Sequence, residues 1–313
     1  MSFLLAAVGL VLLLFAGDAL VRGAVALSLR LGIPPFIVSL TIVGFGTSAP
    51  ELLIAIEAAL EGLPGIALGN VVGSNIANVF LVLGVPALVA PLLTSGCDTK
   101  ETYFQMLGAT AIFVVLCFLG PLVLWHGVVL LAILTLMLTR AFLAAQSARR
   151  SGQEMTLEDL EDADPDMPTW KMVAYLLGGV VGLPLGAALL IEGAEDVARL
   201  LGVSEEVIGL TLVALGTSLP ELATTVMAAI RRQAEVALGN VIGSNMFNLL
   251  AIMGIASLFG PLPVAPELLM RDIWVMVAAA LALIPFVLMG RDMGRGFGIA
   301  FLAIYLIYIA TLF

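Results

Sequence analysis

The sequence predicts an all-α polytopic membrane protein whose ten transmembrane helices form two inverted-topology repeats of five helices each. Two observations support this prediction: a high apolar content and an internal repeat. Of the 313 residues, 61% are apolar and 12% are charged, whereas average soluble domains are roughly 45–50% apolar and about 25% charged. This composition excludes a disordered chain and an ordinary soluble enzyme. The net charge of −10 excludes a nucleic-acid-binding protein, because it leaves no basic surface for a phosphate backbone.

Ten apolar stretches are long enough to cross a membrane. A bilayer core about 30 Å thick requires roughly 20 apolar residues in a helix. The first stretch has no basic segment before it, since the first positive residue is Arg22, so we expect a membrane helix rather than a cleaved signal peptide. The predicted helices cover residues 2–29, 35–60, 64–90, 104–121, 124–147, 170–198, 205–230, 235–259, 271–289 and 296–312.

The positions of Lys and Arg predict how these helices are oriented, because basic residues concentrate in inside-facing connections. With the N-terminus outside, ten of the 13 basic residues fall in inside-facing connections, whereas Arg199 and Arg271 fall outside. The opposite orientation would invert this split. We therefore predict that both termini face outward. No targeting extension is present, so we expect a multi-pass protein of a prokaryotic plasma membrane.

The internal repeat determines the predicted architecture. A shift of 170 residues aligns GFGTSAPEL with ALGTSLPEL and ALGNVVGSN with ALGNVIGSN; residues 44–84 match 214–254 without a gap, with 18 identities in 41 positions. Each half then contains five helices, and an odd number means that the second half enters the membrane from the opposite side. We predict a first repeat over 1–148, a linker over 149–169 and a second repeat over 170–313.

The linker is the only strongly polar part of the chain. Asp162, Asp164 and Asp166 resemble the start of a calcium-binding EF-hand loop, but Met167 stands where that loop requires glycine. We interpret the segment as a solvated, inside-facing linker.

Two acidic residues, Glu51 and Glu221, lie deep within apolar segments. A charge at the membrane centre costs about 2.5–3.5 kcal/mol on insertion scales, so such residues usually have a partner or line an ion pathway. Thr47 and Thr217 precede the two glutamates by four residues and share their helix faces. The same spacing relates Ser74 to Asn78, and Ser244 to Asn248.

Backbone carbonyls add oxygen atoms to this set. Pro50 and Pro220 have no N–H, so the carbonyls of Gly46 and Gly216 lose their helical partners. Carboxylate, hydroxyl, amide and carbonyl oxygens suit hard cations such as Ca²⁺ and Na⁺ rather than zinc or copper. Small and polar residues of this kind also serve close helix packing, but two copies of the whole set favour a cation site.

At these residues the sequence resembles the cation/calcium exchanger superfamily, which includes the prokaryotic sodium/calcium exchangers. GTSAPE and GTSLPE, each followed by GNVxGSN, carry the resemblance, which covers essentially the whole chain. The resemblance implies that Glu51 and Glu221 are the central ligands of the transported ions. Several relatives have aspartate where this chain has Asn248. The other implied ligands are Thr47, Ser48, Ser74, Asn78, Thr217, Ser218, Ser244 and Asn248, with the carbonyls of Gly44 and Ala214.

The resulting hypothesis is a secondary-active antiporter that exchanges Na⁺ for Ca²⁺ by alternating access at a midplane site. The resemblance implies that the first and sixth helices move against the rest, and Gly178, Gly179, Gly182 and Gly186 suit close sliding contact. A Ca²⁺/H⁺ antiporter of the same fold is the main alternative, and K⁺ remains a candidate ion. A cation channel and an intramembrane enzyme are less favoured, because the repeat lies within one chain and no nucleophile–base pair is present.

Further expectations concern cofactors, partners and one ion pair. We expect no cofactor, no nucleic acid and no obligate protein partner; the expected partners are the lipid bilayer, Ca²⁺ and Na⁺, with H⁺ or K⁺ as alternative ions. Asp18 and Arg22 are spaced for an ion pair within the first helix. We interpret that pair as structural rather than as part of the transport site.

Overall fold

The computed structural model describes residues 2–97, 99–150, 167–200 and 216–312, with side chains described outside 144–150. Regular structure in these residues is helical throughout, and the only β contacts among them are two isolated bridges. The helices of the first half are α1 (Ser2–Leu31), α2 (Pro35–Val38), η1 (Ser39–Val43), α3 (Gly44–Thr47), α4 (Ala49–Leu60), α5 (Pro64–Phe80), α6 (Gly84–Val89), η2 (Thr94–Gly96), α7 (Lys100–Leu119) and α8 (Leu124–Arg150).

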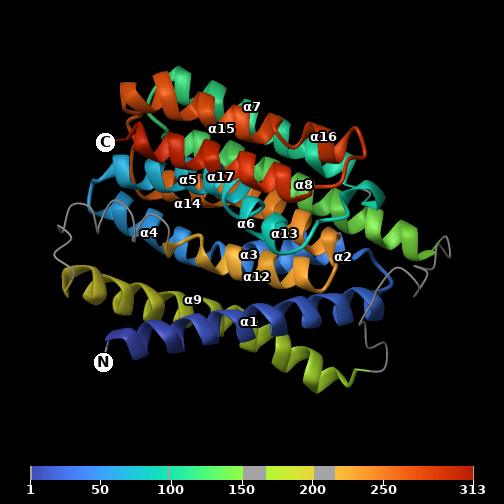
Figure 1. The fold of residues 1–313 in the computed structure, drawn as a ribbon. Coiled ribbons are helices and arrows are strands. Elements are labelled where there is room, and N and C mark those ends of the chain that lie inside the picture. The colour runs from blue at the N-terminus through green and yellow to red at the C-terminus, as the bar shows by residue number, and fades with distance from the viewer. Residues whose placement is uncertain (1, 98, 151–166, 201–215, 313) are drawn as a thin grey trace.

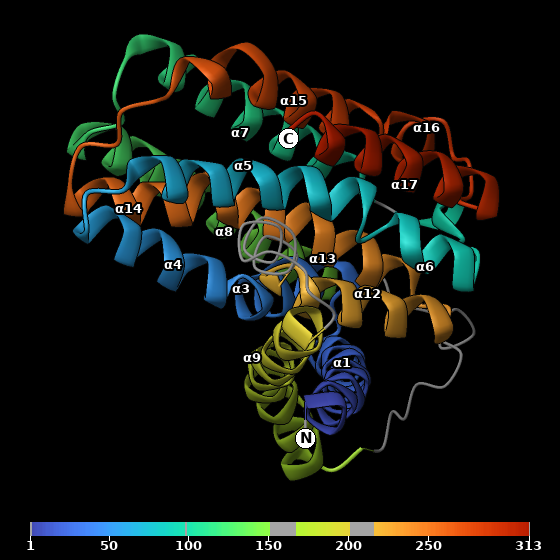
Figure 2. The ribbon, with the colours of Figure 1, turned by 60° about the vertical axis from the view of Figure 1, so that its left-hand side comes forward.

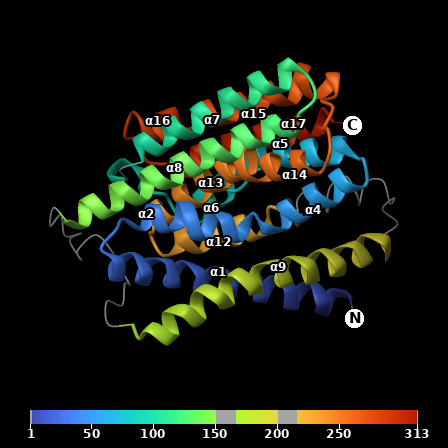
Figure 3. The same ribbon diagram turned by 180° about the vertical axis from the view of Figure 1, so that it is seen from behind.

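The second half contains a matching series of helices (Figure 1). It comprises α9 (Thr169–Leu200), α12 (Leu219–Ile230), α13 (Ala234–Phe247), η5 (Asn248–Ile252), α14 (Met253–Phe259), η6 (Leu268–Asp272), α15 (Ile273–Leu281), α16 (Ile284–Val287) and α17 (Arg295–Ala310). The described ends of the chain, near Ser2 and Leu312, lie at the same end of the helices in both Figure 1 and Figure 3.

Seven described helices are long and apolar enough to cross a membrane, and an eighth span results if the bent pair 35–47 and 49–60 is counted once. The shorter apolar helices α12 and α17 fall on the predicted stretches 205–230 and 296–312. The first part of the stretch 205–230, up to residue 215, lies outside the described residues. Most of the predicted linker, residues 151–166, lies outside them as well.

Several predicted helices are longer or more broken than the sequence suggested. The helix predicted at 104–121 already begins at Lys100, and the helix predicted at 124–147 continues to Arg150. The stretch 35–60 bends by 45° at Ser48, which leaves the helical region with ψ of 7°. Ser218 has nearly the same backbone angles as Ser48. Both serines lie two residues before a proline, and proline removes a helical hydrogen bond.

Helices α1 and α9 form an antiparallel pair on one face of the molecule. Figure 2 looks nearly along these two helices, while the remaining helices run across the view. Glycine lets them approach closely: a Cβ atom at Gly9 would lie 2.4 Å from the backbone nitrogen of Leu190, and one at Gly179 would lie 2.5 Å from the Cβ of Leu20. The predicted glycine contacts of α9 therefore face α1, but Gly178 faces open space.

Contacts in the two halves repeat with the 170-residue shift found in the sequence. Gly9 contacts Leu190, and Gly179 contacts Leu20. These two contacts are equivalent, because a shift of 170 residues converts position 9 into 179 and position 20 into 190. The two bridges, Leu92 with Met293 and Leu262 with Leu122, correspond to within one residue. The main apolar core lies between α5, α7, α13 and α15.

Candidate cation site

Helices α4 and α12 place the two glutamates inside the molecule. Glu51 and Glu221 each occupy the first turn of a short helix that begins just after Ser48 or Ser218. The first turn of a helix carries unpaired N–H groups and a partial positive charge, which stabilises a carboxylate there. The side chains are buried, with exposed fractions of 1% for Glu51 and 0% for Glu221. Each glutamate therefore depends on the protein, or on a bound cation, to balance its charge.

The carboxylate of Glu221 is bound by hydroxyl groups from both halves of the chain. Its Oε1 accepts a hydrogen bond from Ser48 at 3.2 Å and a longer one from Ser244 at 3.5 Å. The hydroxyls of Ser244 and Thr47 are 3.4 Å apart. The first-half residues Thr47 and Ser48 thus lie directly beside the second-half residues Glu221 and Ser244.

The carboxylate of Glu51 is buried at the equivalent place in the first turn of α4. When both glutamates are ionised, electrostatic repulsion acts between them. The Oε2 atoms of Glu51 and Glu221 are both buried without a hydrogen-bond partner in the structure. Two mutually repelling carboxylates with unpaired oxygen atoms form a site that a cation would stabilise.

Further predicted ligands offer unpaired polar atoms. The hydroxyls of Thr217 and Ser218, the Oδ1 of Asn78, and both side-chain amide atoms of Asn248 are buried without partners. Ser74 is also buried, on α5. Buried polar atoms are normally hydrogen-bonded. Their concentration here is therefore typical of a site that is completed by a ligand or by water.

Of the two predicted carbonyl ligands, the structure describes only that of Gly44. The Gly44 carbonyl lies in the cluster, where it accepts hydrogen bonds from the backbone N–H of Ser48 at 3.1 Å and the hydroxyl of Thr47 at 3.3 Å. Ser244 approaches it at 3.5 Å. Ala214 lies outside the described residues.

The structure adds asparagines that the sequence interpretation did not include as site residues. Asn240 accepts a hydrogen bond from Thr47 at 3.3 Å, and Asn245 accepts one from Asn78 at 3.0 Å. Both lie within the repeated GNVxGSN segment. Their repetition in this motif could have identified both asparagines. They were missed because candidate ligands were selected by i,i+4 spacing, which these two positions do not match.

The site consists of oxygen donors around two carboxylates. Groups of three or more His, Cys, Asp or Glu side chains that could hold a metal are absent from the described part of the chain. Hydroxyl, amide and carbonyl oxygens must therefore supply the remaining ligands of any cation bound here. Oxygen donors of this kind bind hard cations such as Ca²⁺.

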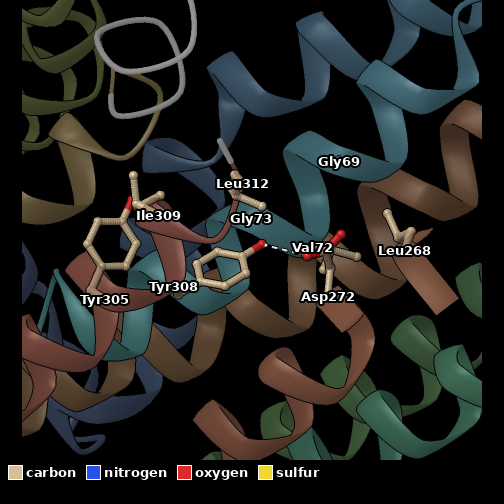
Figure 4. A pocket seen from close by; sticks show the side chains of 9 residues that line it. All are labelled: Gly69, Val72, Gly73, Leu268, Asp272, Tyr305, Tyr308, Ile309 and Leu312. Atoms are coloured by element: carbon tan, nitrogen blue, oxygen red, sulfur yellow. Dashed lines mark hydrogen bonds between the residues drawn. The ribbon is translucent and has the colours of Figure 1, made fainter. Parts of the chain in front are cut away.

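A separate cavity of about 190 Å³ lies between α5, η6 and α17. In Figure 4, Tyr308 and Asp272 meet across it, and the tyrosine donates a hydrogen bond of 3.2 Å to the aspartate. None of the predicted cation ligands lines this cavity, so it is distinct from the site around the two glutamates. Its lining consists of Gly69, Val72, Gly73, Leu268, Asp272, Tyr305, Tyr308, Ile309 and Leu312.

Comparison with known families agrees with this arrangement of residues. The family model described as sodium/calcium exchanger protein matches residues 1–143 and 171–313. The chain belongs to the sodium/calcium exchanger family. The match covers both copies of the repeated motif and omits only the region around the polar linker.

Individual relatives extend over nearly the full chain. The sodium/calcium exchanger MaX1 of Methanosarcina acetivorans is 34% identical over 349 aligned positions, which cover 100% of this chain and 98% of the relative. A putative antiporter, CaxA of Alkalimonas amylolytica, is 36% identical over 288 residues, with 92% and 89% coverage. A solved structure of the sodium–calcium exchanger NCX_Mj superimposes with a TM-score of 0.84, at 32% identity, and covers 100% of this chain and 99% of that one.

Membership of this family establishes the general activity. The chain is a multi-pass membrane protein of a family that transports Na⁺ and Ca²⁺ by antiport. The buried carboxylates and their oxygen-rich surroundings are the feature of the described residues that suits such transport.

Proposed function

We propose that the chain exchanges Na⁺ for Ca²⁺ by alternating access at one site shared by Glu51 and Glu221. The main supporting observation is that both carboxylates are buried and that each has an oxygen without a hydrogen-bond partner. An uncompensated pair of buried negative charges is costly, so a cation load stabilises the occluded state. Thr47, Ser48, Thr217, Ser218, Asn78 and Asn248 supply further oxygen atoms, with Ser74 and Ser244 as additional candidates.

Charge balance provides the coupling between the two ions. Two carboxylates carry a charge of −2, which one Ca²⁺ or two Na⁺ neutralise. Because both ions use the same oxygen atoms, each excludes the other. The empty site has the highest electrostatic cost of all the loading states, so it does not readily pass through the closed intermediate. The site therefore changes sides only with Na⁺ or Ca²⁺ bound, so the movement of one ion in one direction is coupled to the movement of the other ion in the opposite direction.

We further propose that α1 and α9 are the moving elements. They pack mainly on each other through glycine-mediated contacts, on one face of the molecule. α1 also contacts α12, which carries Glu221. A shift of the α1–α9 pair along α12 would open the glutamates alternately to the two sides of the membrane.

The ten-helix inverted repeat is proposed on the basis of these contacts and the sequence. We assign 1–148 and 170–313 to the two repeats, and 149–169 to a linker on the inside. In support, Asn70 donates to the Glu51 carbonyl and Asn240 donates to the Glu221 carbonyl, a pair of equivalent bonds under the 170-residue shift. Both described ends of the chain lie at the same end of the helices (Figure 3), as expected for an even number of spans. We place that end outside a prokaryotic plasma membrane.

The coupling ion is tested by ⁴⁵Ca²⁺ uptake into proteoliposomes with Na⁺, K⁺ or pH gradients imposed separately. Uptake driven by an outward Na⁺ gradient, and insensitive to a protonophore, is expected. Uptake that follows only the pH gradient and disappears with the protonophore would replace Na⁺ by H⁺ as the coupling ion. Uptake without any counter-ion would indicate a channel.

The site is tested with Glu51→Gln and Glu221→Gln, each of which should abolish exchange in a folded protein. Glu57→Gln is the matched control, because Glu57 lies on α4 with Glu51 but is exposed. Normal exchange by both site variants would disprove the site assignment.

A further inference from the structure

The two copies of the GNVxGSN segment are held differently, and the difference lies in one asparagine of each. Asn240 is fully buried, and its side-chain amide bonds to three neighbours. Its amide nitrogen donates to the Glu221 carbonyl at 3.3 Å and to the Thr225 hydroxyl at 3.0 Å, and its Oδ1 accepts from Thr47 at 3.3 Å. A single amide group thus connects α12, α13 and α3.

The equivalent amide of the first half lacks this support. Asn70 is only partly buried, and its amide donates to the Glu51 carbonyl at 3.4 Å. Ala55 occupies the position that corresponds to Thr225, so no hydroxyl is available there. Thr217, which corresponds to Thr47, has a buried hydroxyl without a partner.

The polarity of these bonds fixes which atom of the Asn240 amide faces the Thr47 hydroxyl. The Glu221 carbonyl can only accept, so the amide nitrogen of Asn240 must face it, and Thr225 takes up its second N–H. The Oδ1 of Asn240 is then the atom that faces Thr47, and it can only accept. Thr47 has one hydroxyl hydrogen and two acceptors at 3.3 Å, the Oδ1 of Asn240 and the Gly44 carbonyl. Donation to Asn240 directs the hydrogen away from the cluster and leaves the oxygen lone pairs of Thr47 free for a cation.

We propose that Thr225 is a positioning residue for cation binding: through Asn240 it holds the Thr47 hydroxyl in the orientation that ligates the transported ion. Thr225 does not itself touch the ion. The inference rests on the proposed cation site, and it assigns to the second half of the chain a supporting hydroxyl that the first half does not have.

The test compares two neighbouring threonines of α12. Thr224 and Thr225 are both fully buried, but the Thr224 hydroxyl bonds to the Pro220 carbonyl at 2.8 Å within its own helix. Valine at either position removes one hydroxyl at nearly the same volume. Thr225→Val should raise the Ca²⁺ concentration for half-maximal exchange about three- to tenfold, the factor expected for one lost hydrogen bond. The maximal rate should stay within about twofold, and Thr224→Val should leave both quantities unchanged.

Two further variants separate positioning from a general packing effect. Thr225→Ser restores a hydroxyl and should recover the wild-type half-saturating concentration. Thr225→Ala reproduces the residue that the first half carries at this place and should behave like Thr225→Val. If Thr225→Val also folds poorly, the comparison of the serine and alanine variants decides the question.

The inference is overturned if Thr225→Ser and Thr225→Ala have the same half-saturating Ca²⁺ concentration, or if Thr224→Val shifts it as much as Thr225→Val. This failure is distinguishable from failure of the proposed function. Loss of exchange in Glu51→Gln and Glu221→Gln, together with no effect at Thr225, would remove only the positioning role. Retained exchange in both glutamine variants would remove the site itself.

Discussion

The two halves of the site carry the same motif but make different contacts. Glu221 accepts hydrogen bonds from Ser48 and Ser244, and the hydroxyl of Ser48 comes from the opposite half. The equivalent hydroxyl of Ser218 is buried without a partner. Equal sequences therefore do not give equal ligand geometry. The first-half hydroxyls of Thr47 and Ser48 are bonded to groups of the second half, whereas the second half keeps more oxygen atoms free for an ion, including the hydroxyls of Thr217 and Ser218.

In the α1–α9 pair, by contrast, the two halves make equivalent glycine contacts. Substitutions at these contacts should have the largest effect on exchange. Gly9→Val and Gly179→Val should each reduce the exchange rate by at least about tenfold, because a side chain at either position overlaps the facing helix. Gly178→Val is the control on α9, since that glycine faces open space. Initial rates of ⁴⁵Ca²⁺ uptake measure the effect. Equal rates for Gly178→Val and Gly179→Val would contradict the close sliding contact.

Asn248 offers a way to measure how much the unpaired oxygens contribute. Both of its side-chain amide atoms are buried without partners. Asn248→Ala should weaken Ca²⁺ binding about tenfold, because one oxygen ligand is lost without any internal bond being broken. Equilibrium ⁴⁵Ca²⁺ binding to purified protein measures this. Asn75→Ala is the control, since the Asn75 amide bonds to the Val71 carbonyl of its own helix; an equal loss there would argue against a direct role of Asn248.

The contact between Ser48 and Glu221 predicts a coupling that its counterpart lacks. In a double-mutant cycle on Ca²⁺ binding, Ser48→Ala and Glu221→Asp should show an interaction energy of about 1 kcal/mol or more, as expected for a hydrogen bond to a charged group. The counterpart cycle, with Ser218→Ala and Glu51→Asp, should show less than about 0.5 kcal/mol, because the Ser218 hydroxyl has no hydrogen-bond partner. Similar values in the two cycles would mean that the halves are equivalent after all.

The smallest expected effect on Ca²⁺ binding concerns the ion pairs in the middle of α1. Asp18 bonds to Arg22 at 3.0 Å and also to Arg231, just after α12. Under the repeat shift, Ala188 stands in place of Asp18, and Glu61 in place of Arg231. Asp18→Asn should lower the free energy of unfolding in mixed micelles by about 1–3 kcal/mol, with little change in Ca²⁺ binding. Glu192→Gln, on the exposed part of α9, should change neither; an equal loss in both variants would remove the special role of the ion pairs.

The sequence predicted local features of the fold well, because they depend on the chemistry of single segments. The hydrophobic stretches coincide with helices, apart from the part of 205–230 outside the described residues. The ion pair of Asp18 and Arg22 is confirmed at 3.0 Å, because both residues lie on one helix. Lost helical hydrogen bonds before Pro50 were predicted, but the end of one helix at Ser48 and the start of another at Ala49 were not, since proline at the start of a short helix and proline within a long one look alike in sequence.

The site was predicted less completely, because its contacts join distant segments. The i,i+4 spacing selected Thr47, Glu51 and their equivalents, but no pattern indicated that the Ser48 hydroxyl would reach Glu221, 173 residues away. Arg231 was missed as a partner of Asp18 for the same reason. Asn240 was missed although it belongs to the repeated motif, since its role depends on Thr225 and Thr47, which lie on other helices.

The central claim is that glutamates from both halves share one ion, and equilibrium ⁴⁵Ca²⁺ binding to the purified protein tests it directly. The account predicts one Ca²⁺ per chain, displaced by Na⁺, with binding lost in Glu51→Gln and lost equally in Glu221→Gln. Two Ca²⁺ per chain, with only one lost in each variant, would show that the carboxylates serve separate sites and would contradict the account.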